Sequence, residues 1–213
     1  MVHSKVKTDP IYDTIKEGIM SGRLVPGEQL KQDDIARRYG VSKIPVREAL
    51  ARLEVDGFVL FRKNRGATVR EMTADELLQL MDIRIALECK ALETAVPHMV
   101  ASDISGAKQI LKECASKTEL EDWSDLNVRF HQQLYEPCGN RQLVQMISDL
   151  RQRMGPHIRL LVTEASGLTR PQDEHHDILN ACETGDVDTA VKLLCAHIET
   201  TKKETAAKLR KMS

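Results

Sequence analysis

The sequence predicts a mostly α-helical chain in which a short N-terminal part with one β-hairpin precedes a larger part built only from helices. Three observations carry this prediction. Residues 32–50 show two short helical patterns joined by a tight turn, residues 58–69 hold two apolar and β-branched arms around a polar turn, and the residues beyond 72 show only helical periodicity. A chain of 213 residues suffices for a small module followed by a larger domain.

The net charge of −1 conceals an asymmetry between the two parts. Residues 1–70 hold 14 Lys and Arg against 9 Asp and Glu, whereas the rest holds 17 against 23. A basic head of +5 on an acidic body of −6 fits a DNA-reading module attached to a part that senses another signal. Because no apolar run reaches membrane-spanning length and no signal peptide opens the chain, we expect a cytoplasmic protein with no membrane partner.

The first helical pattern begins at Asp9-Pro10, which are typical of a cap and a first helical residue, and it stops at Ser21-Gly22. The two patterns within 32–50 have the spacing of a helix-turn-helix, with a small Ala36, a Gly four residues later and an apolar Val46. Gly40 can take the positive φ that the turn needs, and Ser42 can cap the second helix.

The exposed side of this second helix is basic. A hairpin of helices with an ordinary solvated face is the alternative, but the small residue, the Gly, the cap and the basic face all favour a DNA-recognition helix. We expect it to enter the major groove, with contacts from five residues: Ser42, Lys43, Ile44, Arg47 and Arg52.

The strand pair follows directly, with arms at 58–61 and 67–69 around a turn at 63–66. A helix-turn-helix followed by a basic hairpin is a winged helix. The hairpin can serve packing alone, but the charges near its tip favour contacts of Arg65 and Gly66 with phosphate or the minor groove.

Beyond residue 72 we predict an all-helical bundle. Thr73 and Glu76 form a capping box for a long helix that runs to about Val96, where Pro97 ends or kinks it. Five further helical patterns follow, at 102–115, 119–136, 140–164, 171–184 and 186–210. The predicted domains are therefore 8–72 for DNA binding and 73–210 for the helical part.

Three of the predicted helices place a histidine within an apolar stripe. His131 shares a helix face with Phe130 and Leu134, and His175 and His197 stand in stripes of the same spacing. Burying one imidazole without a partner costs on the order of 1–3 kcal/mol, so three independent burials are improbable. We predict that the three converge on one divalent cation such as zinc or nickel, with Asn127 beside His131 as a weaker fourth ligand.

The opposing interpretation is that each histidine is a satisfied core residue. His176 lies about 100° around the helix from His175, so we expect it on the surface. Arg84 and Glu88 also fall on an otherwise apolar seam. They form either a structural ion pair or a site in which Glu88 orients Arg84 toward the carboxylate of a ligand, and Arg159 can border that pocket.

These motifs resemble those of a known family. Residues 8–72, with IA…YGVS…PVREAL, LEVDGFV and NRGATV, are similar to the winged helix of GntR-family transcription regulators. The second part resembles the helical FCD domain of the FadR subfamily through Arg84-x-x-x-Glu88, Asn127-x-x-Phe130-His131, Gly139-Asn140, Glu174-His175, Gly185-Asp186 and His197.

The resemblance implies a homodimer that binds double-stranded DNA at an inverted-repeat operator and responds to a small organic-acid effector. Two positions depart from the family pattern. Lys43-Ile44 stands where Arg-Thr is common, which bears on base preference, and Asn127 stands where Asp is commonest. We therefore expect a regulator. An architectural DNA-binding dimer without effector and a metal-dependent enzyme with a DNA-binding head are the alternatives; the first would show no ligand-induced thermal shift, the second turnover.

Overall fold

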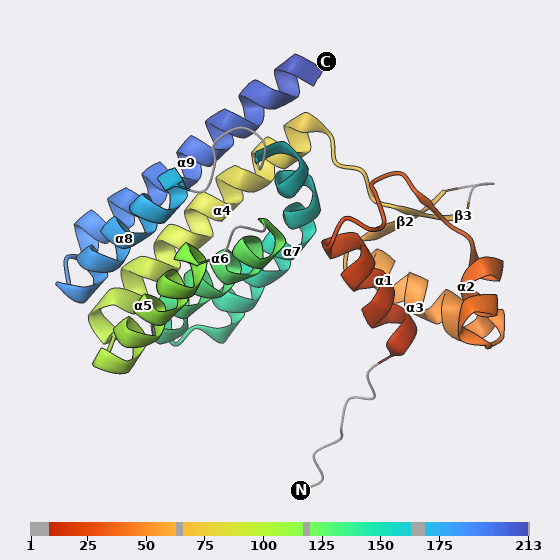
Figure 1. The fold of residues 1–213 in the computed structure, drawn as a ribbon, viewed down its shortest axis with the longest axis horizontal. Helices are drawn as coiled ribbons and strands as arrows, with labels where there is room; N and C mark the ends of the chain where they lie inside the picture. Colours follow the sequence, from red (N-terminus) through yellow and green to blue (C-terminus); the bar gives the residue numbers. More distant parts are fainter. Residues whose placement is uncertain (1–8, 63–65, 117–119, 163–168, 213) are drawn as a thin grey trace, which may run out of the picture. The chain divides into compact units, whose positions relative to one another are not determined.

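The computed structural model describes residues 9–62, 66–116, 120–162 and 169–212 (Figure 1). The chain divides into two compact units between Met72 and Thr73. Among the described residues, the first unit contains helices and short strands and the second contains helices only. No helix in these ranges is long and apolar enough to span a lipid bilayer.

The first unit follows the predicted order with one added strand. Its elements are α1 (Pro10–Met20), β1 (Gln29–Leu30), α2 (Gln32–Tyr39), α3 (Lys43–Val55), β2 (Val59–Arg62) and β3 (Gly66–Val69). β3 lies between β1 and β2, and both pairings are antiparallel. Strand β1 was not predicted from the sequence, because a strand of two residues is too short to show an alternating pattern.

Apolar side chains from these elements form a separate core under the sheet. α1 begins as predicted, with the Asp9 side chain accepting hydrogen bonds from the backbone N–H groups of Ile11 and Tyr12. The most deeply buried members come from α3 and β2: Val46, Ala49, Leu50, Leu53 and Val59.

The turn between α2 and α3 is the one that the sequence predicts. Gly40 has φ +63°, which ends α2 in the left-handed region, and Ala36 is buried where α3 packs against α2. The expectation for Ser42 was wrong in one respect. Ser42 is the N-cap residue of α3, but its side chain makes no capping hydrogen bond in this structure.

The predicted hairpin pairs Val59 with Val69 and Arg62 with Gly66. Gly66, the first residue of β3, has φ +71°, a left-handed conformation that glycine adopts without strain. Lys63, Asn64 and Arg65 lie outside the described residues, and so does the predicted tip of the wing.

The second unit packs its helices around one core. The elements are α4 (Ala74–Ala95), η1 (Val96–His98), α5 (Ala101–Ala115), α6 (Leu120–Tyr135), η2 (Glu136–Cys138), α7 (Arg141–Val162), α8 (Thr169–Glu183) and α9 (Val187–Met212). α4 and α9 lie side by side and span the unit (Figure 1), and α4 also packs against α6 and α7. The Thr73 side chain caps α4 through the N–H of Glu76, and Pro97 falls in the single 3₁₀ turn that follows α4.

Candidate functional site

The three histidines that the sequence places in apolar stripes come together inside the second unit. His131 on α6, His175 on α8 and His197 on α9 are 0 %, 0 % and 8 % exposed. One ligand nitrogen of each lies within 4.8 Å of the others. His176, the neighbour on α8, is exposed, as its helical phase predicts.

Several ring nitrogens in this cluster have no hydrogen-bond partner within the described ranges. They are Nε2 of His131 and both Nδ1 and Nε2 of His175. The Oδ1 atom of Asn127, one turn before His131, is likewise buried without a partner there. Because an unsatisfied buried polar atom costs about 1–3 kcal/mol, these atoms fit a shared ligand better than a closed core.

Two further ring nitrogens of the cluster are held by side chains. Nδ1 of His197 lies 2.6 Å from Oε2 of Glu174, and Nδ1 of His131 lies 3.1 Å from the hydroxyl of Tyr135. A carboxylate or hydroxyl on one nitrogen directs the lone pair of the other toward a metal, which is the usual arrangement around metal-binding histidines.

Electrostatics keep two of the rings neutral. Burial, aided by the positive charge of Arg151, holds the pKa of His131 well below its usual 6.5. Burial together with His197 and Arg151 lowers the pKa of His175 in the same way. A neutral imidazole is the form that binds metal, so the cluster is ready to act as a ligand at neutral pH.

A buried carboxylate with two arginines adjoins the histidines. Glu88 is fully buried and accepts hydrogen bonds from Arg84 Nε at 2.7 Å, from Arg151 Nη1 at 3.0 Å and from the Tyr135 hydroxyl at 2.6 Å. Burial raises the pKa of Glu88, but the two arginines outweigh this and bring it to about 2. Two guanidinium groups against one carboxylate leave a net charge of +1 inside the unit.

Arg151 was missed in the sequence, although the same signal marks it. It stands between Ile147 and Met154 at helical spacing, as Arg84 stands between Met81 and Glu88. The side chain of Arg159, in contrast, lies outside the described residues.

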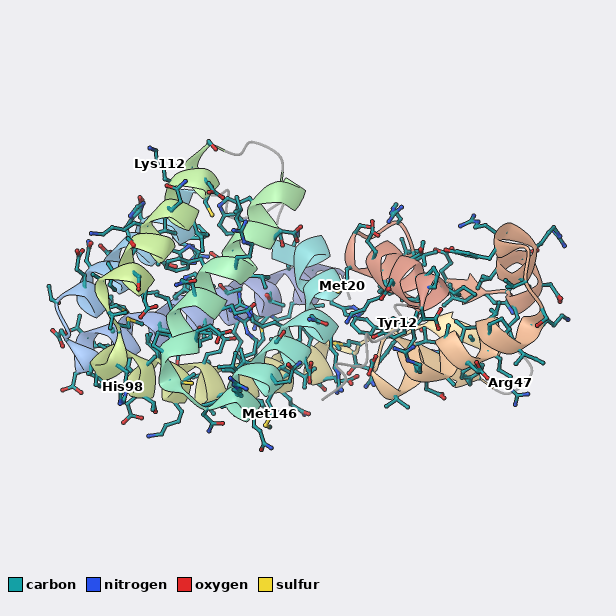
Figure 2. All side chains as sticks on the ribbon, turned by 90° about the horizontal axis from the view of Figure 1, so that it is seen from below. Tyr12, Met20, Arg47, His98, Lys112 and Met146 are labelled. Atoms are coloured by element: carbon teal, nitrogen blue, oxygen red, sulfur yellow. The ribbon has the colours of Figure 1, made fainter. Side chains whose placement is uncertain are left out.

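The exposed face of α3 carries the residues predicted to contact DNA. Ile44 is 69 % exposed and Arg47 projects from the helix surface (Figure 2). Lys43 pairs with Asp33 at 2.6 Å, and the Arg52 guanidinium lies over the Tyr12 ring at 4.5 Å. If Lys43 contacts DNA, it must leave Asp33 and bind a phosphate or a base instead. Arg52 already packs against Tyr12 of α1.

A winged helix joined to a helical unit with a histidine cluster defines a DNA-binding regulator with a sensing domain. Residues 7–69 match the gntR family of bacterial regulatory proteins, and residues 79–200 match the FCD domain. The chain belongs to the GntR family and carries an N-terminal GntR helix-turn-helix and a C-terminal FCD domain of the FadR-like subfamily.

Relatives and solved structures agree with this assignment. The chain is 27 % identical to the HTH-type regulator BphR of Paraburkholderia xenovorans, over 88 % of this chain and 80 % of BphR. It is 26 % identical to the repressor GlaR of Escherichia coli, over 89 % and 91 %. The solved structure of E. coli McbR/YncC is similar at a TM-score of 0.77 and 26 % identity, covering 90 % of this chain and 92 % of that one.

These relatives are transcription regulators and not enzymes, so the expectation of a regulator is confirmed and the enzymatic alternative is not supported. The geometry agrees. Glu174, a carboxylate beside the histidines that an enzyme could use as a general base, is held by His197 and by Arg170 at 2.7 Å.

Proposed function

We propose that this regulator binds an inverted-repeat operator as a homodimer. Its affinity for that operator changes when a small carboxylate metabolite binds, together with a divalent metal ion, in the helical domain. The proposal assigns residues 8–72 to DNA binding and 73–210 to effector binding and dimerisation. It rests on one observation above all. Three histidines from three helices converge on one point, and buried nitrogens of two of them lack partners among the described residues.

The donor set fits a metal such as zinc or nickel. Imidazole nitrogens suit these ions, and Oδ1 of Asn127 adds a neutral oxygen beside His131. A neutral amide is a weaker ligand than a carboxylate, so we expect the metal to be held less tightly than with a carboxylate at position 127. When bound, the ion supplies a positive contact that a carboxylate can share with protein side chains.

The arginine pair favours an anionic effector. Burying a net charge of +1 is costly, and a ligand carboxylate would neutralise it. Arg84 uses Nε for Glu88, and the two terminal nitrogens of its guanidinium form a fork suited to a carboxylate. Glu88 therefore orients Arg84, and Arg159 is assigned to the border of the same pocket.

A dimer follows from the requirements of DNA recognition. A single helix-turn-helix buries too little DNA surface for operator affinity, and two-fold symmetry in the protein matches an inverted repeat. We assign contacts in each half-site to seven residues: Ser42, Lys43, Ile44, Arg47, Arg52, Arg65 and Gly66. Binding to an operator in bacterial DNA places the protein in the cytoplasm.

Transmission between the domains has a short covalent route. β3 ends at Val69 and α4 begins at Ala74, and α4 carries Arg84 and Glu88. A ligand that binds Arg84 and the histidines together joins α4 to α6, α8 and α9. If two arrangements of these helices exist, the ligand shifts their populations in proportion to its difference in affinity for them.

The test uses full-length protein, with duplexes selected by it from a random DNA pool. Metal content is measured by elemental analysis, and a panel of organic, amino and sugar acids is screened by thermal shift with and without metal. A true effector at 100 times its Kd should stabilise the protein by about 2.7 kcal/mol and alter the affinity for selected DNA. If no acid shifts stability or DNA affinity, the architectural alternative is correct, and turnover of any acid would support an enzyme.

A further inference from the structure

The hydroxyl of Tyr135 occupies a position between two charged or metal-binding groups. It lies 2.6 Å from Oε2 of Glu88 on one side and 3.1 Å from Nδ1 of His131 on the other. All three residues are buried, Glu88 on α4 and the other two on α6. A directed chain of hydrogen bonds therefore links α4 to the histidine cluster.

The direction of this chain follows from the number of protons. A tyrosine hydroxyl has one proton to donate, and an ionised carboxylate only accepts. Glu88 is ionised because Arg84 and Arg151 both contact it. A phenol keeps its proton at neutral pH, and at 2.6 Å from an ionised carboxylate the Tyr135 hydroxyl donates that proton to Glu88.

The remaining contact determines the state of His131. With the hydroxyl proton directed at Glu88, only an oxygen lone pair faces Nδ1 of His131. A bond at 3.1 Å then requires the proton on Nδ1, because the other tautomer would set two lone pairs against each other. Nε2 is left as the basic nitrogen, and it is the atom buried without a partner among the described residues.

We propose that Tyr135 is a positioning residue for the metal site. Its hydroxyl holds His131 in the Nδ1–H form, so that Nε2 is free to bind the ion. The same hydroxyl donates to Glu88, so the tautomer of His131 depends on the Glu88–arginine cluster. This inference rests on the metal site of the proposed function. Glu174 plays the corresponding part for His197, and His175 has no such partner in the described ranges, so Tyr135 acts on His131 alone. Groups that hold a ligating histidine typically change metal affinity by 10–100-fold.

The decisive variant is Tyr135→Phe, which keeps the ring and removes only the hydroxyl. The matched control is Tyr12→Phe, which removes a hydroxyl that donates to a carboxylate, Asp56, in the other unit. Affinity for Zn²⁺ and Ni²⁺ alone is measured by chelator competition on full-length protein. We expect affinity to fall 10–100-fold in Tyr135→Phe and to stay within twofold of wild type in Tyr12→Phe.

A second measurement reads the His131 tautomer directly, and its main result needs only the wild-type protein. Long-range ¹H–¹⁵N NMR on metal-free wild-type protein at pH 7.5 should show His131 protonated on Nδ1 with a free Nε2, and Tyr135→Phe should lose this preference. Protonation of Nε2 of His131 in wild type, or equal metal affinity of wild type and Tyr135→Phe, would overturn the positioning role of Tyr135 and leave the proposed metal site standing. If wild type binds neither metal, the metal site falls and the positioning role with it.

Discussion

Nδ1 of His197 lies 2.6 Å from Oε2 of Glu174, twenty-three residues earlier in the chain. The carboxylate is fixed in turn by Arg170, which also reaches Glu204 at 2.8 Å. Burial raises the pKa of Glu174, but the hydrogen bonds from His197 and Arg170 lower it overall, so the group is ionised at neutral pH. An ionised carboxylate hydrogen-bonded to Nδ1 makes Nε2 of His197 a stronger ligand for a metal ion.

The first prediction separates two adjacent histidines on α8. His175→Ala removes a buried ring of the cluster and should abolish metal binding and blunt the effector response, while DNA binding by the winged helix survives. His176→Ala removes an exposed ring and should change neither. Elemental analysis of both variants decides the matter. Loss of metal from His176→Ala but not from His175→Ala would show that the histidine cluster is not the site.

A second prediction concerns pH in the metal-free protein. His131 and His175 have pKa values well below 6.5 in the folded state, so below pH 6.5 the unfolded chain takes up protons that the folded chain does not. Stability is therefore fully present above pH 6.5 and lost as pH falls, by up to roughly 1.4 kcal/mol per pH unit for each ring. Denaturant unfolding with chelator at pH 7.5, 6.5 and 5.5 measures the slope.

Trp123 offers the signal for that experiment. It is the single tryptophan of the chain, and its ring stacks near His175 with centroids 6.2 Å apart. His175→Gln should reduce the slope by about half, whereas His176→Gln should leave it as in wild type. Equal stability from pH 7.5 to 5.5 would mean that these rings titrate alike in the folded and unfolded chain.

The third prediction tests the recognition helix. Arg47 is exposed on α3, and no ion pair of Arg47 exists among the described residues, so it is available for DNA. Arg47→Ala should weaken binding to selected duplexes by roughly 1–3 kcal/mol per half-site at fixed salt. Arg23→Ala is the control, since Arg23 is an exposed arginine outside the recognition helix, paired with Glu17. Unchanged affinity for Arg47→Ala would refute the assignment.

The fourth prediction concerns Ile44, an exposed apolar residue at the start of α3. An apolar side chain that is 69 % exposed between Lys43 and Arg47 suits contact with a thymine methyl group in the major groove. Replacing the contacted thymine by deoxyuridine removes that methyl and should cost roughly 0.8 kcal/mol, about fourfold in affinity. Ile44→Ala should bind the thymine duplex more weakly than wild type, and its affinity should not change when thymine is replaced by deoxyuridine. If the effects of Ile44→Ala and of the base replacement add independently, the contact is ruled out.

Much of the fold is determined by local sequence. Asp9-Pro10, Gly40, Thr73 and Pro97 mark helix ends because caps, positive φ and the missing proline N–H act within a few residues. Helical phase is equally local, so the burial of His175 and the exposure of His176 were predictable from spacing alone.

Tertiary structure decided what each buried group meets. Periodicity says that a side chain faces inward but not which neighbour it finds. The Tyr135 hydroxyl reaches Glu88 across 47 residues and Arg151 reaches the same carboxylate across 63, so neither contact leaves a local pattern. The two-residue strand β1 exists only because β3 lies beside it. The histidines were predictable as a set, whereas the protons, partners and net charge around them depend on packing between helices distant in sequence.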